Sequence, residues 1–139
     1  MSIYNPQIHS ITTALASGIR TSTQTITSAG LLDKNVGTSP ETPGMIAYLN
    51  VTQASGTGGL SLSLQEIDPI SGATNVVLAT LNNTGTGLIK LKIKSAIAAI
   101  APTSTNAQAQ DILPPRWQLQ VIHGDASNYT YSLGIVLYA

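Results

Sequence analysis

Few side chains in this chain are of the types that perform acid–base or metal chemistry. The two histidines, His9 and His123, lie far apart in the sequence, and the spacing of histidines and carboxylates matches no metal-binding motif. We therefore expect both histidines to be structural, and we predict no metal site. The chain contains no cysteine, which excludes a thiolate nucleophile, a disulfide and a zinc site of the usual kind.

The six acidic residues are scattered along the chain. Asp68 and Asp125 fall in glycine-containing turns, where an aspartate accepts a hydrogen bond from the backbone two residues further on. We therefore expect capping roles for these two residues, ahead of a general acid–base pair. Asp33 and Glu41 share a loop rich in Gly and Pro and are candidates for cation binding, although their spacing matches no calcium-loop pattern.

Glycine and serine are abundant, but neither forms a catalytic motif. No dinucleotide-binding fingerprint and no P-loop lysine follows a predicted strand and opens a helix, so the glycine-rich segments are interpreted as turns. No serine occupies a nucleophile elbow. We predict that the protein is not an enzyme and binds no cofactor. A hydrolase, the weaker alternative, would need a pocket that holds His123 with two carboxylates.

Trp117 and a row of lysines, Lys90, Lys92 and Lys94, are the remaining candidates for binding. Trp117 could stack on a sugar, but in a chain without Phe a tryptophan on an alternating strand is expected to fill the core. The lysines could contact an acidic partner, yet such a row more commonly keeps a strand soluble and discourages edge pairing. We assign neither feature to a site.

The elements that carry these residues are expected to be β-strands, because apolar and polar residues alternate with a period of two. In the segment 88–94, Ile89, Leu91 and Ile93 are expected on one side and the three lysines on the other. In the segment 60–65, the leucines are expected inward and the serines and glutamine outward. Strands are predicted over the ranges 19–27, 46–54, 60–65, 75–81, 88–94, 117–121 and 129–138.

Short connections rich in Gly, Asn, Asp and Pro separate these strands. Such connections join antiparallel neighbours but cannot hold the crossover between parallel strands. About seven or eight strands with turns at near-regular spacing are typical of an all-β fold, an antiparallel β-sandwich or a jelly roll. We predict this fold for residues 17–139, as one domain.

Three segments interrupt the alternation. Residues 1–16 mix isoleucines with a proline and a histidine and are predicted to form an N-terminal arm, and residues 30–44 are predicted to form a loop. Residues 96–115 are the longest irregular stretch and end in Pro114-Pro115, which forces an extended entry into the next strand. A loop of this length in a compact domain is more often functional than idle.

The charge and hydropathy of the chain argue against nucleic-acid and membrane partners. Six Lys plus Arg balance six Asp plus Glu, so no basic excess holds phosphates, and we predict no nucleic-acid partner. The longest aliphatic run, residues 96–101, is far shorter than the roughly 20 residues that cross a bilayer, and no secretory signal is visible, so we expect no membrane partner. Only 9% of the residues are charged, and a neutral, hydroxylated surface favours a place within an assembly.

Four segments occur in a characteristic order: LNVTQASGT (49–57), LSLSLQEIDPISG (60–72), LPPRWQLQVIHGDA (113–126) and YTYSLG (129–134). This succession resembles a group of small β-sandwich structural proteins of tailed bacteriophages, found among head and capsid-associated gene products. The resemblance covers residues 19–138. Because its motifs are strand and turn patterns, it bears more directly on the fold than on the role.

The resemblance implies a capsid decoration or cement protein, a virion structural protein that binds the major capsid protein on the outside of the head. Such proteins commonly form homotrimers at local three-fold positions, where closed symmetry uses one patch several times. We expect the N-terminal arm and the loop 96–115 to carry the contacts. Two alternatives stay open: a carbohydrate- or receptor-binding module of a tail fibre or adhesin, and a tail or connector component.

Overall fold

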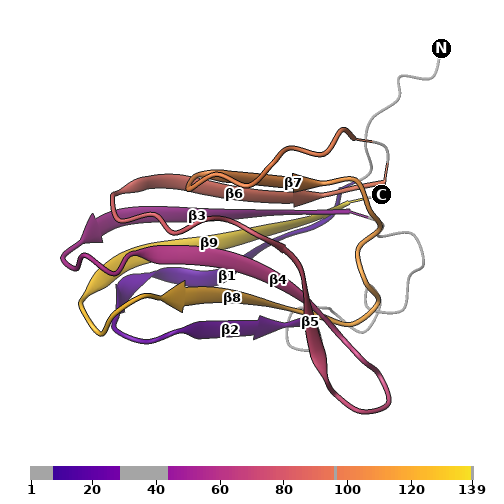
Figure 1. Cartoon of the computed structure of the whole chain (residues 1–139), viewed down its shortest axis with the longest axis horizontal. Helices are drawn as coiled ribbons and strands as arrows, with labels where there is room; N and C mark the ends of the chain where they lie inside the picture. The colour runs from indigo at the N-terminus through magenta and orange to yellow at the C-terminus, as the bar shows by residue number, and fades with distance from the viewer. Residues whose placement is uncertain (1–7, 29–43, 96, 139) are drawn as a thin grey trace.

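The computed structural model describes residues 8–28, 44–95 and 97–138, which form two β-sheets packed face to face (Figure 1). One sheet has the order β1-β9-β3-β6-β7 and the other the order β2-β8-β4-β5. The predicted β-sandwich is confirmed. The nine strands in these ranges are β1 (Ile8–Arg20), β2 (Gln24–Thr27), β3 (Gly44–Ala54), β4 (Leu60–Ile67), β5 (Thr74–Ala79), β6 (Gly87–Ile93), β7 (Asn106–Ala109), β8 (Trp117–His123) and β9 (Tyr129–Tyr138).

The strand order is that of a jelly roll. The first four positions of the five-stranded sheet correspond to the four positions of the other sheet. In order, the corresponding strands are β1 and β2, β9 and β8, β3 and β4, and β6 and β5. The two members of each match are consecutive along the chain, so β1–β2, β3–β4, β5–β6 and β8–β9 each link equivalent positions of the two sheets. This nesting of two Greek keys defines the jelly roll, and β7 is an addition at one edge.

The prediction of purely antiparallel sheets was wrong at that edge. Strand β7 pairs with β6 in parallel, from Lys90 opposite Asn106 to Ile93 opposite Ala109. The stretch between β6 and β7 is long enough to return the chain for parallel pairing, which a tight turn cannot do. The predicted irregular stretch 96–115 therefore contains a strand, and its Ala107 is fully buried.

The predicted N-terminal arm was also wrong for residues 8–16, which belong to β1 and pair with β9. Strand β1 is irregular, because its pairing shifts register at three places between Ile8 and Gly18. Each bulge adds a residue and reverses the alternation of side chains, so no period of two is visible in the sequence. The expected domain boundary at residue 17 falls inside this strand. Residues 1–7, and all but Gly44 of the expected loop 30–44, lie outside the described residues.

The core forms from alternate residues of the strands, as the period of two predicts. Trp117 is 1% exposed, which confirms its predicted place between the sheets. In β6, Ile89, Leu91 and Ile93 are fully buried, and the lysines between them point to the outer face. The longest run of core side chains comes from β9: Tyr129, Tyr131, Leu133, Ile135 and Leu137.

Candidate functional site

The two histidines do not come together in the fold. His9 lies near the start of β1, which pairs there with the end of β9. His123 ends β8 and contacts Tyr131, near the start of β9. Within the described ranges, no group of three or more His, Cys, Asp or Glu side chains is placed to hold a metal ion. Asp33 and Glu41, the candidates for cation binding, lie outside those ranges.

His123 lies among aromatic side chains at this end of the sandwich. Its Nε2 is 2.8 Å from the hydroxyl of Tyr131, and its ring meets Tyr129 edge-on at 5.3 Å. Its Nδ1 is buried without a hydrogen-bond partner. Burial lowers the pKa of His123, and the Arg20 guanidinium lowers it further, while Asp125 opposes the shift. The arrangement favours a neutral imidazole.

Arg20 binds backbone carbonyls at the last register shift of β1, between Leu15 and Gly18. Its Nη1 donates to the carbonyl of Tyr131 at 2.7 Å, and its Nη2 donates to the carbonyl of Ala16 at 2.6 Å. Nη1 also reaches the carbonyl of Gly18 at 3.2 Å, and the guanidinium lies 4.9 Å from the centre of the Tyr131 ring. The side chain thus satisfies carbonyls that the bulge leaves without strand partners. The sequence gives no local signal for this role.

Asp125 joins two loops next to His123. As predicted, it caps its own turn, because Oδ1 accepts from the backbone N–H of Ser127 at 3.1 Å. It also accepts from the N–H of Gly58 at 2.8 Å and from the hydroxyl of Tyr129 at 2.9 Å. The N–H of Gly58 is the main reason that the pKa of Asp125 is lowered. Sequence reasoning missed these bonds because Gly58 is remote in the chain.

The two loops approach so closely that they require glycine. A Cβ on Gly124 would lie 2.1 Å from the carbonyl oxygen of Gly58, and a Cβ on Gly58 would lie 2.5 Å from the carbonyl carbon of Gly124. The N–H of Gly124 donates to the carbonyl of Gly59 at 2.9 Å. This end of the sandwich, on the left in Figure 1, is therefore closed by direct backbone contact between the two loops.

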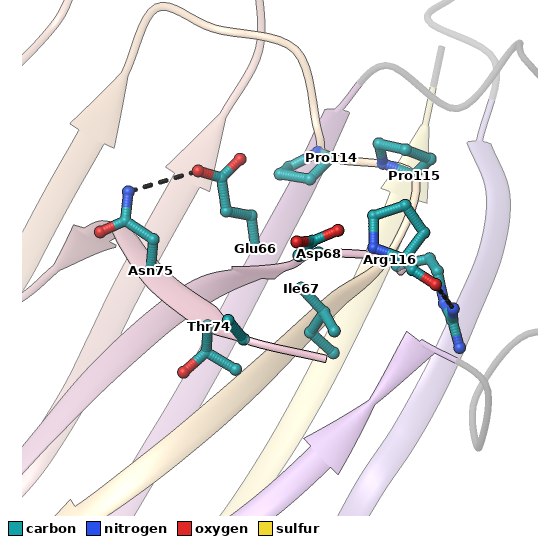
Figure 2. Close-up of a pocket in the computed structure, with 10 residues that line it drawn as sticks. Glu66, Ile67, Asp68, Thr74, Asn75, Pro114, Pro115 and Arg116 are labelled. Atoms are coloured by element: carbon teal, nitrogen blue, oxygen red, sulfur yellow. Dashed lines mark hydrogen bonds between the residues drawn. The ribbon is translucent and has the colours of Figure 1, made fainter. Parts of the chain in front are cut away.

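The opposite end carries a groove beside the β4–β5 hairpin, which we call the hairpin groove (Figure 2). It consists of two adjoining hollows of about 390 Å³ each, which share Glu66, Asn75, Pro114 and Pro115. One wall is the hairpin, and the other is the segment 110–116, which carries the chain from β7 to β8. The other lining residues are Ile67, Asp68, Pro69, Ala73, Thr74, Val76, Val77, Asp111, Ile112 and Arg116.

The hairpin groove combines apolar walls with an acidic rim. Exposed Glu66 accepts a hydrogen bond from the amide of Asn75 at 3.3 Å, and Figure 2 shows the two side chains next to each other. Asp68 is occupied by its own turn, as predicted: it accepts from the N–H of Ile70 at 2.9 Å and from Ser71 Oγ at 2.7 Å. These bonds, that of Ser71 first, lower the pKa of Asp68.

Across the groove, Arg116 donates to the carbonyl of Pro69 at 3.4 Å, and the rings of Pro114 and Pro115 form the adjoining wall. A groove of this kind can receive an aliphatic chain with a cationic or hydroxylated end. Sequence reasoning marked residues 96–115 as a functional loop, but it did not bring Glu66 or Asp111 to the groove. Their convergence is a product of the tertiary fold.

The outer face of the four-stranded sheet carries a chain of amide hydrogen bonds. Gln118 donates to Gln65 at 2.6 Å, Gln65 donates to Gln120 at 2.8 Å, and Gln120 donates to Thr25 at 3.1 Å. Ser63 and Gln65 were expected to face water, but they are only 2% and 8% exposed. The long glutamine side chains of β8 lie across β4 and cover them.

A scan against protein-family models and a search of curated proteins gave no match to this chain. In the described ranges, no helix has the length and apolar character needed to span a membrane.

Proposed function

We propose that this protein is a structural component of a bacteriophage particle, a decoration or cement protein that binds the major capsid protein on the outside of the head. The observation that carries the proposal is the position of β1 at the edge of its sheet, where β9 is its only partner among the described strands. This strand extends over 13 residues at one side of the five-stranded sheet, and it has no Lys, Asp or Glu along its length.

An edge strand of this kind can pair with a strand of a neighbouring molecule. Edge strands of soluble proteins usually carry lysines, prolines or other devices that prevent pairing with a neighbour. In β1, Ile11 and Ile19 are 73% and 67% exposed, and the one charged side chain, Arg20, turns inward to its own carbonyls. Strand addition at such an edge supplies backbone hydrogen bonds, and exposed apolar side chains add buried area. The segment Ser10–Thr13, which pairs with β9 without a register shift, is the best-formed part of the edge.

The low charge and the resemblance to small β-sandwich head proteins support the same role. With 9% charged residues, the surface carries little like-charge repulsion against a lattice of identical neighbours. The virion, at the capsid surface, is the location that this proposal implies.

Binding to purified phage heads that lack the protein tests the proposal. Electron microscopy should reveal the added protein on the head surface, and the occupied heads should withstand more heat than bare heads. The variants Ile11→Lys and Ile19→Lys should lower occupancy, because a charge on the edge must be desolvated on pairing. Leu81→Lys, at a residue 59% exposed in a loop away from β1, is the matched control and should bind normally. Failure of the native protein to bind heads would refute the role.

Deletion of residues 1–16 does not isolate an arm, because it removes nine residues of β1. Substitutions on the outer side of β1 leave the pairing with β9 intact and therefore separate binding from folding.

The hairpin groove favours a second candidate function, a carbohydrate- or receptor-binding module of a tail fibre or adhesin. Glu66 and Asn75 offer acceptors and a donor for sugar hydroxyls beside apolar walls. A glycan array, with Glu66→Gln as the comparison, tests this function, and binding that the substitution abolishes would support it. Labelling of intact particles distinguishes many copies on the head from a few at the tail tip, and it also reveals a tail or connector component.

A further inference from the structure

Two surfaces of this protein are complementary in charge and in apolar character. The first is the outer face of the five-stranded sheet around Lys90 and Lys92, which we call the lysine face. Core residues Ile89, Leu91 and Ile93 point inward, so the two lysines between them point outward on β6. No carboxylate of the described ranges forms an ion pair with Lys90 or Lys92.

The lysine face also has an apolar part. Ile46 of β3 lies directly opposite Lys92, and Tyr48 lies directly opposite Lys90. On the other side of β3, Ile46 is opposite Val136 and Tyr48 is opposite Gly134. Gly134 adds no side chain next to Tyr48, and a Cβ there would have its nearest neighbour at 4.0 Å. The face thus presents two ammonium groups beside a half-exposed aromatic and aliphatic patch.

The second surface is the hairpin groove, which has the opposite charge and similar apolar character. Glu66 and Asp111 are exposed on its rim, and neither has an ion-pair partner among the described residues. Val76 and Ile112 are 54% and 59% exposed beside them. A lysine stem fits an apolar groove, and its ammonium then reaches the carboxylates at the rim.

Among the described residues, no ion pair joins the lysine face to the hairpin groove of the same molecule. The lysines point away from the core on one sheet, whereas the groove opens between the β4–β5 hairpin of the other sheet and the segment 110–116. The two surfaces can meet between copies, when the lysine face of one molecule contacts the hairpin groove of the next. Such a contact uses two different patches and is therefore heterologous, so it generates a ring if the rotation closes and a filament if it does not.

We propose that copies of this protein associate head to tail, with the lysine face of one molecule on the hairpin groove of its neighbour. The inference concerns the purified chain alone and does not depend on whether the protein decorates a phage head. It names Lys90 and Lys92 as the cationic side of the contact and Glu66 and Asp111 as the anionic side.

Sedimentation velocity on the purified protein, over micromolar to millimolar concentrations and at low and high salt, tests the contact. The native chain should associate, and added salt should weaken the association. Two charge-reversed variants separate the surfaces. Lys90→Glu with Lys92→Glu gives a face variant that is acidic on both surfaces, and Glu66→Lys with Asp111→Lys gives a groove variant that is basic on both. Each alone should associate at least about tenfold more weakly than the native chain.

A mixture of the two variants is the decisive measurement. The acidic face of the first then meets the basic groove of the second, and the remaining two surfaces form the native contact. Association should therefore return on mixing. Thr84→Glu with Thr86→Glu, at exposed positions in the loop before β6, is the control for added negative charge and should associate like the native chain.

Three results would overturn the inference: a native chain that stays monomeric throughout, face and groove variants that associate normally, or a mixture that stays monomeric although circular dichroism shows both variants folded. None of these results bears on binding to heads, so the proposed function is judged separately.

Discussion

At the scale of single residues, Arg20 holds several backbone carbonyls with one side chain. It donates to three carbonyls, and two of them belong to Ala16, within the register shift between Leu15 and Gly18, and to Gly18, where pairing with β9 resumes. A lysine has one ammonium in place of a planar fork and cannot reproduce this set of bonds.

Arg20→Met should therefore lower the free energy of unfolding by about 2–3 kcal/mol, because it leaves part-buried carbonyls without donors. Urea denaturation followed by tryptophan fluorescence measures the change. Arg116→Met is the matched control: Arg116 makes one long hydrogen bond at 3.4 Å, and its loss should change stability by less than about 0.5 kcal/mol. Equal effects of the two substitutions would contradict the role of Arg20.

His123 makes stability depend on pH in the range where histidine titrates. Its folded pKa is lowered, so the unfolded chain binds more protons as the pH falls through that range. Stability is then fully present above the ordinary histidine pKa of about 6.5 and is lost as the pH falls toward the folded value. Protonation of Nδ1 would place a buried donor where no acceptor is present.

We expect the free energy of unfolding to decline between about pH 7 and pH 5, and the decline to be smaller in His123→Gln. Asp68 and Asp125 also have lowered pKa values, but carboxylates titrate near pH 4, so their effect on stability begins at lower pH. A pH profile unaltered by His123→Gln would assign the dependence to other groups.

At the scale of elements, the two loops that close one end of the sandwich set a tight steric limit. Gly124→Ala should lower the free energy of unfolding by about 2 kcal/mol or more, because the new methyl group overlaps the carbonyl of Gly58 and forces the loops apart. Gly85→Ala is the control: the nearest atom to its Cβ is 3.6 Å away, and stability should change little. Thermal unfolding of the three proteins provides the comparison.

The strands also differ in how well the sequence predicts them. Strands β4, β6, β8 and β9 were predicted because their core residues alternate without interruption, and burial alone selects that pattern. Strand β1 was missed because bulges interrupt its alternation of apolar and polar residues. Strand β7 was missed because a strand of only four residues is too short to show an alternation. The role of Asp68 followed from local turn chemistry, whereas the hairpin groove depends on residues brought together from three separate segments.

At the scale of the whole molecule, the jelly roll places distant parts of the chain next to each other. The first strand, β1, pairs with the last, β9, and β9 also pairs with β3. The five-stranded sheet therefore forms only when β9 joins it. Long-range pairing of this kind costs loop-closure entropy before it brings stabilising contacts.

Refolding from denaturant should accordingly take milliseconds to seconds, the range of all-β sandwiches, and not microseconds. Stopped-flow tryptophan fluorescence follows the burial of Trp117. Leu133→Ala, in the interior strand β9, should slow refolding if β9 docks in the rate-limiting step, whereas Val76→Ala, at an exposed position of β5, should leave the rate unchanged. A microsecond phase that accounts for the full amplitude would contradict this view.

The pairing of Ile8 with Tyr138 has a practical consequence for display. Cargo attached directly at Ile8 or at Tyr138 would leave the sandwich from the same corner, so two different tags would emerge side by side. The same adjacency allows Ile8 and Tyr138 to be joined by a short linker and new ends to be opened at Gly85, a permutation that should retain the fold. If copies of the protein decorate a capsid, each permuted copy would carry its cargo on the loop that contains Gly85, which precedes β6.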